Sequence, residues 1–142
     1  MALPFPRAIP FVDLLGVELL RFGGGEAELG LDLKDEHSNS LGMAHGGVVM
    51  TLLDVVQAHA GRSALLGTPQ EGQAMITIEM KTSFMRPSTG RLRAVGRIKH
   101  RTRSMAFTEG EVFDAQGRLC AHATGTFKYV TPTPATPPGG SD

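Results

Sequence analysis

The stretch Asn39-Ser-Leu-Gly-Met-Ala-His45-Gly46-Gly47-Val-Val-Met-Thr-Leu-Leu-Asp54 decides how this chain folds. It joins an amide-bearing turn and a His-Gly-Gly sequence to the hydrophobic run Val48 to Leu66, the only long segment that we predict to be helical. A lone acid, Asp54, lies inside this run. The helix is predicted to bury one broad face, because its apolar residues recur with helical spacing at Val48, Val49, Leu52, Leu53 and Val56.

The segments around this helix alternate polar and apolar residues, which is typical of strands with one buried face. Gly23 to Gly25 permit a tight reversal, so the first two strands should form a hairpin. Between Ala74 and Met85 the alternation predicts that Ile76, Ile78, Met80, Thr82 and Phe84 share one face, which packs on a core. The predicted strands are Val17 to Phe22, Glu26 to Leu33, Ala74 to Met85, Arg91 to Lys99, Met105 to Asp114 and Leu119 to Val130.

This order of strand, strand, helix and four strands predicts an α+β fold with one helix on one face of an antiparallel sheet. Ile9 to Leu15 could add a short helical lid, and Lys34 to Leu41 should be a loop. We expect a single domain over residues 1–130. Residues 131–142 hold four of the nine prolines and should form a disordered tail.

Composition excludes several classes of function. Lys and Arg number 14 and Asp and Glu number 14, with no block of like charge, so the basic surface of a nucleic-acid binder is missing. No signal-peptide core or apolar run of membrane-spanning length occurs, and the single Cys120 suits a reducing compartment. We therefore expect a cytoplasmic protein without membrane partners.

Metal binding is also not predicted. The one cysteine has no CxxC partner, and Cys120 lies in a strand pattern where packing is the simpler role. None of the histidines pairs with another at a helical i,i+4 spacing, so neither a metal nor another cofactor is expected. The five histidines are His37, His45, His59, His100 and His122.

Asp54 needs an explanation, because burying even a neutral polar group without partners costs roughly 2 to 7 kcal/mol. It is either a solvated acid on the helix surface or a group held for chemistry. Gly46 and Gly47 open the helix, where the first backbone N–H groups have no intrahelical acceptor. Without side chains, these glycines would let the oxygen of a ligand approach those N–H groups, although simple close packing is the alternative explanation.

The spacing of these groups predicts a shared site. Asp54 follows His45 by nine positions, which corresponds to about two and a half helical turns, or roughly 13 Å along the axis, on opposite sides of the helix. The helix entrance and the acid of one chain therefore cannot act on the same bond. If both take part, a second copy of the chain must supply one of them, most simply across a two-fold axis.

The pattern Asn39-x5-His45-Gly46-Gly47-x6-Asp54, followed by Ile76-Thr-Ile-Glu-Met80 and Phe84-Met-Arg-Pro87, resembles the hotdog-fold acyl-CoA thioesterases of the phenylacetate-degradation type. The likeness runs from about Phe11 to Val130. It implies a curled sheet of about six strands around the central helix, dimers formed by strand pairing, and often a dimer of dimers. It also implies that acyl-CoA is hydrolysed to a carboxylic acid and coenzyme A, which is part of the substrate and not a cofactor.

The resemblance also implies roles for individual residues. The Gly46 N–H and the Asn39 amide would polarise the thioester carbonyl, with Gly47 beside the substrate. The carboxylate of Asp54 of the partner subunit would activate water or attack the carbonyl, and the Thr77 hydroxyl would hold the water. His45 would either approach the leaving thiolate or brace the turn. A related subfamily carries Glu with a Thr one turn later, and Ala58 at that position argues against it.

Coenzyme A carries phosphates, which guanidinium groups can hold bidentately. Arg86, Arg101, Arg103 and Ser104 are candidates, with solvated charges at the sheet edge as the alternative. For Arg91, Arg93 and Arg97, which alternate along one strand, we favour solvated charges.

Two other functions remain open. A hotdog hydratase or dehydratase would use an acid and a histidine, and Asp54 and His59 resemble one such spacing. Five residues turn about 140° on a helix, however, which points the two apart, and we expect His59 to be exposed or satisfied. An inactive acyl-CoA-binding module is the other alternative. The acyl group is not specified, although 7 Met, 7 Phe, 1 Tyr and no Trp favour an adaptable apolar slot.

Overall fold

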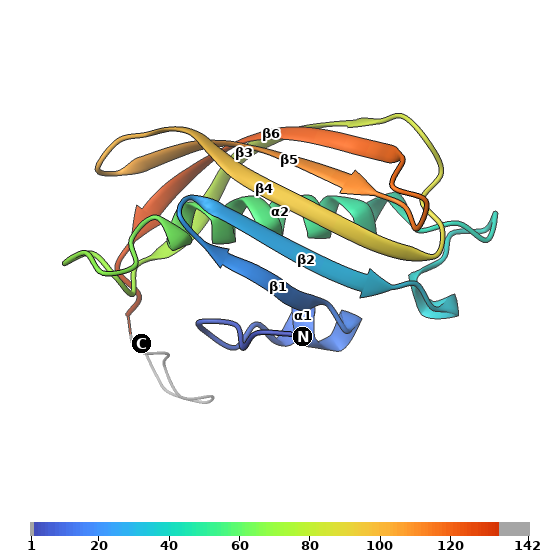
Figure 1. The fold of residues 1–142 in the computed structure, drawn as a ribbon, viewed down its shortest axis with the longest axis horizontal. Coiled ribbons are helices and arrows are strands. Elements are labelled where there is room, and N and C mark those ends of the chain that lie inside the picture. The colour runs from blue at the N-terminus through green and yellow to red at the C-terminus, as the bar shows by residue number, and fades with distance from the viewer. Residues whose placement is uncertain (1, 134–142) are drawn as a thin grey trace, which may run out of the picture.

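A computed structural model describes residues 2–133 of the protein. Six antiparallel strands form one curled sheet in the order β1-β2-β4-β5-β6-β3, and a long helix lies in its concave face (Figure 1). The α+β hotdog layout predicted from the sequence is thus confirmed. The elements are α1 (Pro10–Leu15), β1 (Glu18–Gly23), β2 (Glu26–Asp32), a 3-10 turn (Asp35–His37), α2 (Gly46–Ser63), β3 (Ala74–Phe84), β4 (Arg91–Arg101), β5 (Met105–Phe113) and β6 (Leu119–Val130).

The central helix α2 begins and ends earlier than the hydrophobic run. It starts at Gly46, two residues before Val48, because the His45 side chain accepts the Gly47 N–H at 2.8 Å and caps the first turn. It ends at Ser63, where the N–H of Leu65 bonds to the Arg62 carbonyl in a tighter turn. The cap at the N-terminus therefore includes both glycines in the helix.

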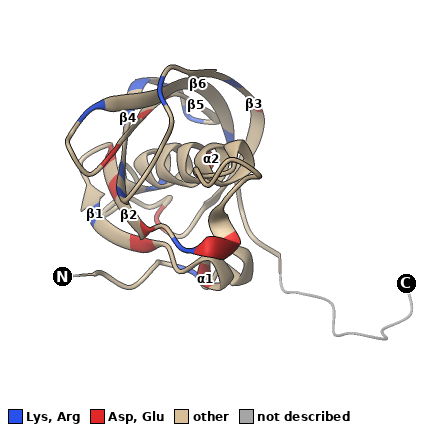
Figure 2. Cartoon of the chain, turned by 90° about the vertical axis from the view of Figure 1, so that its right-hand side faces the viewer, with Lys and Arg blue, Asp and Glu red and all other residues tan. Residues whose placement is uncertain are grey.

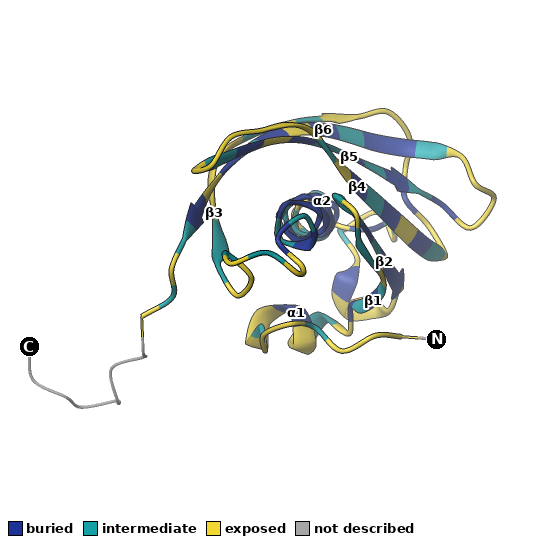
Figure 3. Ribbon diagram, turned by 60° about the vertical axis from the view of Figure 1, so that its left-hand side comes forward, coloured by how far each residue is buried: buried dark blue, intermediate teal, exposed yellow. Residues whose placement is uncertain are grey.

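The core lies between α2 and the concave face of the sheet, which curls around the helix (Figure 3). Three glycines on adjacent strands let the helix approach closely. An added Cβ at Gly96 would lie 2.7 Å from the Val56 carbonyl oxygen, and one at Gly125 would lie 2.7 Å from Gln57 Oε1. At Gly110 the nearest atom, Gln57 Cγ, would lie at 3.1 Å. These positions exclude larger residues because α2 occupies the space.

A buried amide joins the helix to the sheet. Gln57 is fully buried, its Nε2 donates to the Leu53 carbonyl at 2.9 Å, and its Oε1 accepts from the Thr108 hydroxyl at 2.8 Å. Because each end of the amide has a partner, the cost of burying it is offset. The hydrogen bond between Gln57 and Thr108 fixes the middle of α2 over β5.

The predicted faces of β3 are partly wrong. Thr77 pairs with Phe127 but Glu79 pairs with Thr126, so Ile78 is an extra residue that forms a bulge. The bulge reverses the alternation: Thr77 and Met80 both face α2, whereas Ile76 lies on the outer side and is 51% exposed. A strict period of two cannot anticipate an inserted residue.

The ends of the chain and its surface add little to the site. Of α1 only Val12 is fully buried, and Leu15 and the preceding Ile9 also pack against the core, so this segment forms the expected lid. The predicted tail lies, from residue 134 on, outside the described residues.

Figure 2 shows charges of both signs along the strands. No helix within residues 2–133 is long and apolar enough to cross a membrane.

Candidate functional site

The loop before α2 presents the amide of Asn39. Its Oδ1 accepts the backbone N–H groups of Leu41 at 2.9 Å and Met43 at 3.1 Å. These bonds hold the turn and leave the NH2 group of Asn39 as the part of the side chain that can donate to a ligand. The half-buried position of Asn39 keeps that group accessible.

The backbone N–H groups of the two glycines in the first turn of α2 differ in their hydrogen bonding. The Gly47 N–H is used by His45 Nδ1 at 2.8 Å, whereas the Gly46 N–H has no acceptor among residues 2–133. The positive end of the helix dipole therefore offers the Gly46 N–H to a ligand oxygen. This contact fits the bracing role considered for His45, and the approach of its ring to the leaving thiolate stays a prediction.

Asn39 and Gly46 share one depression of about 400 Å³ with Phe84 and Arg86. The Phe84 ring lies 3.6 Å from where a Cβ of Gly46 would stand, so the aromatic side chain forms the wall beside the free N–H. This depression combines two neutral hydrogen-bond donors, an apolar wall and one cation. It fits a polarised carbonyl group that belongs to a larger anionic molecule.

Asp54 and Thr77 meet on the other side of the fold. The Thr77 hydroxyl donates to Asp54 Oδ1 at 2.5 Å, joining the middle of α2 to the start of β3. Asp54 is half-buried and opens into a separate cavity of about 290 Å³. Because the Thr77 oxygen keeps its lone pairs, a water molecule could donate to it and to the free carboxylate oxygen together.

The structure thus brings the predicted residues together in two groups. Asn39, Gly46 and Arg86 line one depression, and Asp54 and Thr77 line another. No described cavity contains both groups, in keeping with the separation expected from helix geometry.

The other predicted phosphate ligands lie elsewhere. Arg101 and Arg103 line a depression beyond the C-terminal end of α2 together with Gln70, and Ser104 lines a neighbouring one. The strand arginines are engaged in ion pairs, Arg91 with Glu18 at 2.7 Å and Arg93 with Glu28 at 3.4 Å, while Arg97 pairs with Glu109. Only Arg86 therefore shares a cavity with the predicted carbonyl-binding groups.

The expectation that His59 is exposed or satisfied is only partly met, because the ring is not exposed and one of its two nitrogens has a partner. The ring is buried, with Nδ1 2.8 Å from the Val55 carbonyl and Nε2 without a partner among the described residues. Burial lowers the pKa of His59 to about 4, an effect that the Val55 hydrogen bond opposes, so the ring is neutral at ordinary pH. The edges of Phe5 and Phe22 pack against it.

Sequence reasoning also missed residues that position the site. The buried ring of His37 accepts the Lys34 N–H at 2.9 Å and lies 2.9 Å from the Leu15 carbonyl, and its own carbonyl accepts the His45 N–H. It thus anchors the turn before α2, although no pattern around it marks a buried residue. Arg62 lines the Asp54 cavity two helical turns further on, a spacing that could have been recognised.

No cluster of three or more metal-ligating side chains occurs in residues 2–133. Cys120 is buried, with its sulfur 3.5 Å from the Arg118 carbonyl oxygen and 3.7 Å from that of Pro87, which is a packing environment. The two candidate cavities therefore offer hydrogen-bond donors, the Asp54 carboxylate and guanidinium groups.

Comparisons with known proteins agree with this inventory. The model of the Thioesterase superfamily matches residues 41–121, from the turn before α2 to β6. A candidate esterase of Saccharolobus solfataricus is 28% identical over 91% of this chain and 89% of its own.

Two solved structures are similar as well. The conserved protein PA5202 of Pseudomonas aeruginosa is 29% identical, with a TM-score of 0.79 over 87% of this chain and 95% of that one. A mutant of the phenylacetic acid degradation protein PaaI of Thermus thermophilus is 27% identical, with a TM-score of 0.75 over 86% and 100%. Because the family model spans more than half of the chain, the chain belongs to the thioesterase superfamily and is a hotdog-fold hydrolase that acts on thioester bonds.

Proposed function

We propose that the protein hydrolyses acyl-CoA thioesters to a carboxylic acid and coenzyme A, in two composite sites of a homodimer. The observation that carries this proposal is the division of the groups: carbonyl-binding donors at Asn39 and Gly46 lie in one cavity, and the Asp54–Thr77 pair lies in another. Two copies related by a two-fold axis would let each cavity complete the other.

The chemistry follows from these positions. The Asn39 NH2 and the Gly46 N–H bind the thioester oxygen and stabilise the negative charge that develops on it. Asp54 of the partner subunit takes a proton from water, whose oxygen bonds to the carbonyl carbon. The C–S bond then breaks, the thiolate leaves, and the proton passes from the carboxylate to the sulfur. Thr77 holds Asp54 in place and positions the water.

The edge strand β3 is the surface that suits the dimer. It pairs with β6 on one side only, and its exposed apolar side chains have no cover in the single chain. Pairing with β3 of a second copy would satisfy its free backbone groups and extend the sheet. The exposed apolar residues on and next to β3 are Ile76, Ile78, Phe84 and Met85.

Substitution of Asp54 tests the enzymatic proposal. Asp54→Asn keeps the shape and removes the base, so kcat should fall by about a hundredfold or more, since general base catalysis contributes roughly 10²–10⁴. Release of coenzyme A from a panel of aliphatic and aryl acyl-CoAs is followed with a thiol-reactive dye. Asp13→Asn, on exposed α1, is the control and should leave the rate unchanged.

The two rival functions predict different results in the same assay. An inactive binding module would release no thiol with any acyl-CoA while still binding the thioesters. A hydratase would instead consume the double bond of an enoyl-CoA, detected by its absorbance, and would lose that activity on His59→Gln. The His59 ring, held by Val55 and packed between Phe5 and Phe22, does not favour a proton carrier.

A further inference from the structure

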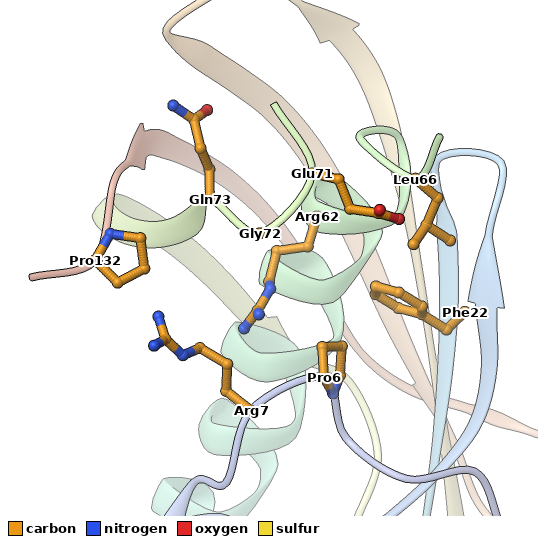
Figure 4. A pocket seen from close by; sticks show the side chains of 9 residues that line it. All are labelled: Pro6, Arg7, Phe22, Arg62, Leu66, Glu71, Gly72, Gln73 and Pro132. Carbon is orange, nitrogen blue, oxygen red and sulfur yellow. The ribbon is translucent and has the colours of Figure 1, made fainter. Parts of the chain in front are cut away.

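Two arginines from distant parts of the sequence meet at the end of the Asp54 cavity. Arg7 precedes α1, and Arg62 lies in the last turn of α2. Both line the cavity of about 290 Å³ that contains Asp54 and Thr77, and both also line an adjoining cavity of about 550 Å³ (Figure 4). The pair therefore stands where the two cavities join.

These two guanidinium groups have no acidic partner within residues 2–133: no carboxylate oxygen of the described chain lies within 4.0 Å of either. The acid on the same wall, Glu71, accepts the Gly67 N–H at 3.3 Å and points towards Leu66 in Figure 4, away from both arginines. Two like charges face the same space without an acidic side chain in contact with either of them.

The surroundings of Arg62 make the absence of an acidic partner unfavourable for its charged form. Arg62 is half-buried, and burial together with the positive charge of Arg7 lowers its pKa. Like charges repel more strongly where solvent screening is reduced. An anion placed between the two guanidinium groups would relieve the repulsion and could be held bidentately.

The path from Asp54 to this pair is lined mainly by apolar groups. Asp54, Ala58 and Arg62 follow one another at intervals of four residues, which places Arg62 about 12 Å along the helix axis from Asp54. Val55, Ala74 and Met75 form other parts of the wall. The neutral His59 ring adds no charge to this path. The cavity thus offers an apolar slot that begins at the reacting carbonyl and ends at two cations.

We propose that this slot receives the acyl group and that Arg62 and Arg7 select thioesters whose acyl chain ends in a carboxylate. This inference rests on the proposed function, because it takes Asp54 as the position of the reacting bond. The phosphates of coenzyme A are the other anions of such a substrate. They fit this position less well, because the slot is small and mostly apolar, whereas Arg86 lies beside the carbonyl-binding groups.

The test compares two thioesters of equal chain length, octanoyl-CoA and the mono-CoA thioester of octanedioic acid. The wild-type protein should show a kcat/KM at least about tenfold higher for the octanedioyl thioester, as expected for a charge-assisted hydrogen bond. Arg62→Gln should lower the ratio of the two kcat/KM values to about one, through a larger loss with the octanedioyl thioester than with octanoyl-CoA. Arg7→Gln should act in the same direction.

Matched variants and a second leaving group make the result specific. Arg62→Lys keeps the positive charge but not the planar guanidinium group, so it should keep part of the preference for the octanedioyl thioester. Arg21→Gln, at an exposed position on β1, is the control and should keep all of this preference. Thioesters of pantetheine lack the nucleotide phosphates. If the arginines bind a carboxylate on the acyl group, pantetheine thioesters should show the same preference for the octanedioyl chain. Arg62→Gln should remove that preference as well.

Three results would overturn the inference. The first is an equal kcat/KM for both acyl chains in the wild type, and the second is an equal loss of kcat/KM for both in Arg62→Gln. The third is an effect of Arg62→Gln that disappears with pantetheine thioesters, which would assign Arg62 and Arg7 to the phosphates of coenzyme A. If no thioester at all is turned over, the proposed function fails instead. The inference is then judged by calorimetric binding of octanamide and of the monoamide of octanedioic acid, of which only the second carries a carboxylate: tighter, Arg62-dependent binding of the monoamide supports it, and equal binding rejects it.

Discussion

The contact between Thr77 and Asp54 is the shortest link between the strand and the helix that carry the predicted chemistry. A hydroxyl that donates to a carboxylate at 2.5 Å both fixes the carboxylate rotamer and occupies one of its oxygens. Asp54 is therefore presented with one free oxygen in a defined direction. The role of the pair in catalysis can be separated from its role in folding by substitution at the hydroxyl.

Replacing Thr77 with Val removes this hydrogen bond at nearly constant shape. We expect kcat to fall about tenfold to a hundredfold, the equivalent of a lost hydrogen bond to a charged group, while Thr77→Ser retains most of the activity. The matched control is Thr82→Val on the same strand, because the Thr82 hydroxyl has no partner among the described residues. Equal activity of Thr77→Val and wild type would remove Thr77 from the site.

His59 should make the protein sensitive to acid. In the unfolded chain its pKa is about 6.5, and in the folded chain it is about 4, so between these values the unfolded state binds more protons. The free energy of unfolding should therefore fall as the pH is lowered from about 6.5 to 4, by up to about 3 kcal/mol from this residue.

Urea unfolding at several pH values measures this effect. The dependence should be shallower in His59→Gln, which cannot titrate, and unchanged in His100→Gln, an exposed histidine on β4. An unchanged pH dependence in His59→Gln would show that the buried ring takes up its proton without cost.

At the level of single residues, the sequence predicted the groups that belong to a local motif. Gly46 and Asp54 could be singled out because helix geometry and hydrogen-bonding capacity are properties of neighbouring residues, and Asn39 because its spacing from them resembles a known family. Arg7 and His37 could not, because their positions depend on contacts with segments far away in the chain. Arg101 and Arg103 line a different depression from Asn39 and Gly46, so their contact with phosphate stays a prediction.

At the scale of the elements, glycines in the sheet set the distance between α2 and the strands. At Gly96 the Val56 carbonyl oxygen occupies the space that a side chain would need. Gly96→Ala should therefore push the helix away and lower the free energy of unfolding by about 1–3 kcal/mol, the usual cost of overpacking. Gly23→Ala is the control, because nothing lies within 4 Å of its Cβ position. Equal midpoints in urea for the two variants would contradict this account.

Element types and most boundaries were predictable, because hydrophobic periodicity reports local conformation. The strand β6 matches its prediction from Leu119 to Val130, and β2 differs by one residue. The start of α2 depended on a side-chain cap, and the faces of β3 on an inserted residue. Neither feature leaves a periodic signal, so both had to be found in the structure.

For the whole molecule, the composite site predicts that two inactive variants restore activity when mixed. Asn39→Asp keeps the acceptor that holds its turn and removes the NH2 donor, and Asp54→Asn removes the base. After unfolding and refolding together, half of the dimers should be mixed and contain one intact site. About one quarter of the wild-type activity is therefore expected.

The control mixes two variants of the same half-site, Asp54→Asn and Thr77→Val. Every site in such a dimer is damaged, so no activity above the separate variants should return. Light scattering supplies an independent measurement of mass. A monomeric protein, or the lack of recovery in the first mixture despite subunit exchange, would contradict a site shared between chains.

The bulge makes Ile78 a residue that the pairing of β3 with β6 does not use. Thr77 faces Asp54, and Met80 faces α2 as well, because one unpaired residue shifts the alternation between them. A scan of this strand should accordingly find that apolar substitutions of Ile78 retain activity. Its deletion should leave the Thr77 hydroxyl facing α2, because Thr77 would then stand two positions before Met80, as in a regular strand. Homologues should likewise be aligned here by counting residues between the hydroxyl and the buried methionine, because matching hydrophobic letters would place the gap on the wrong side.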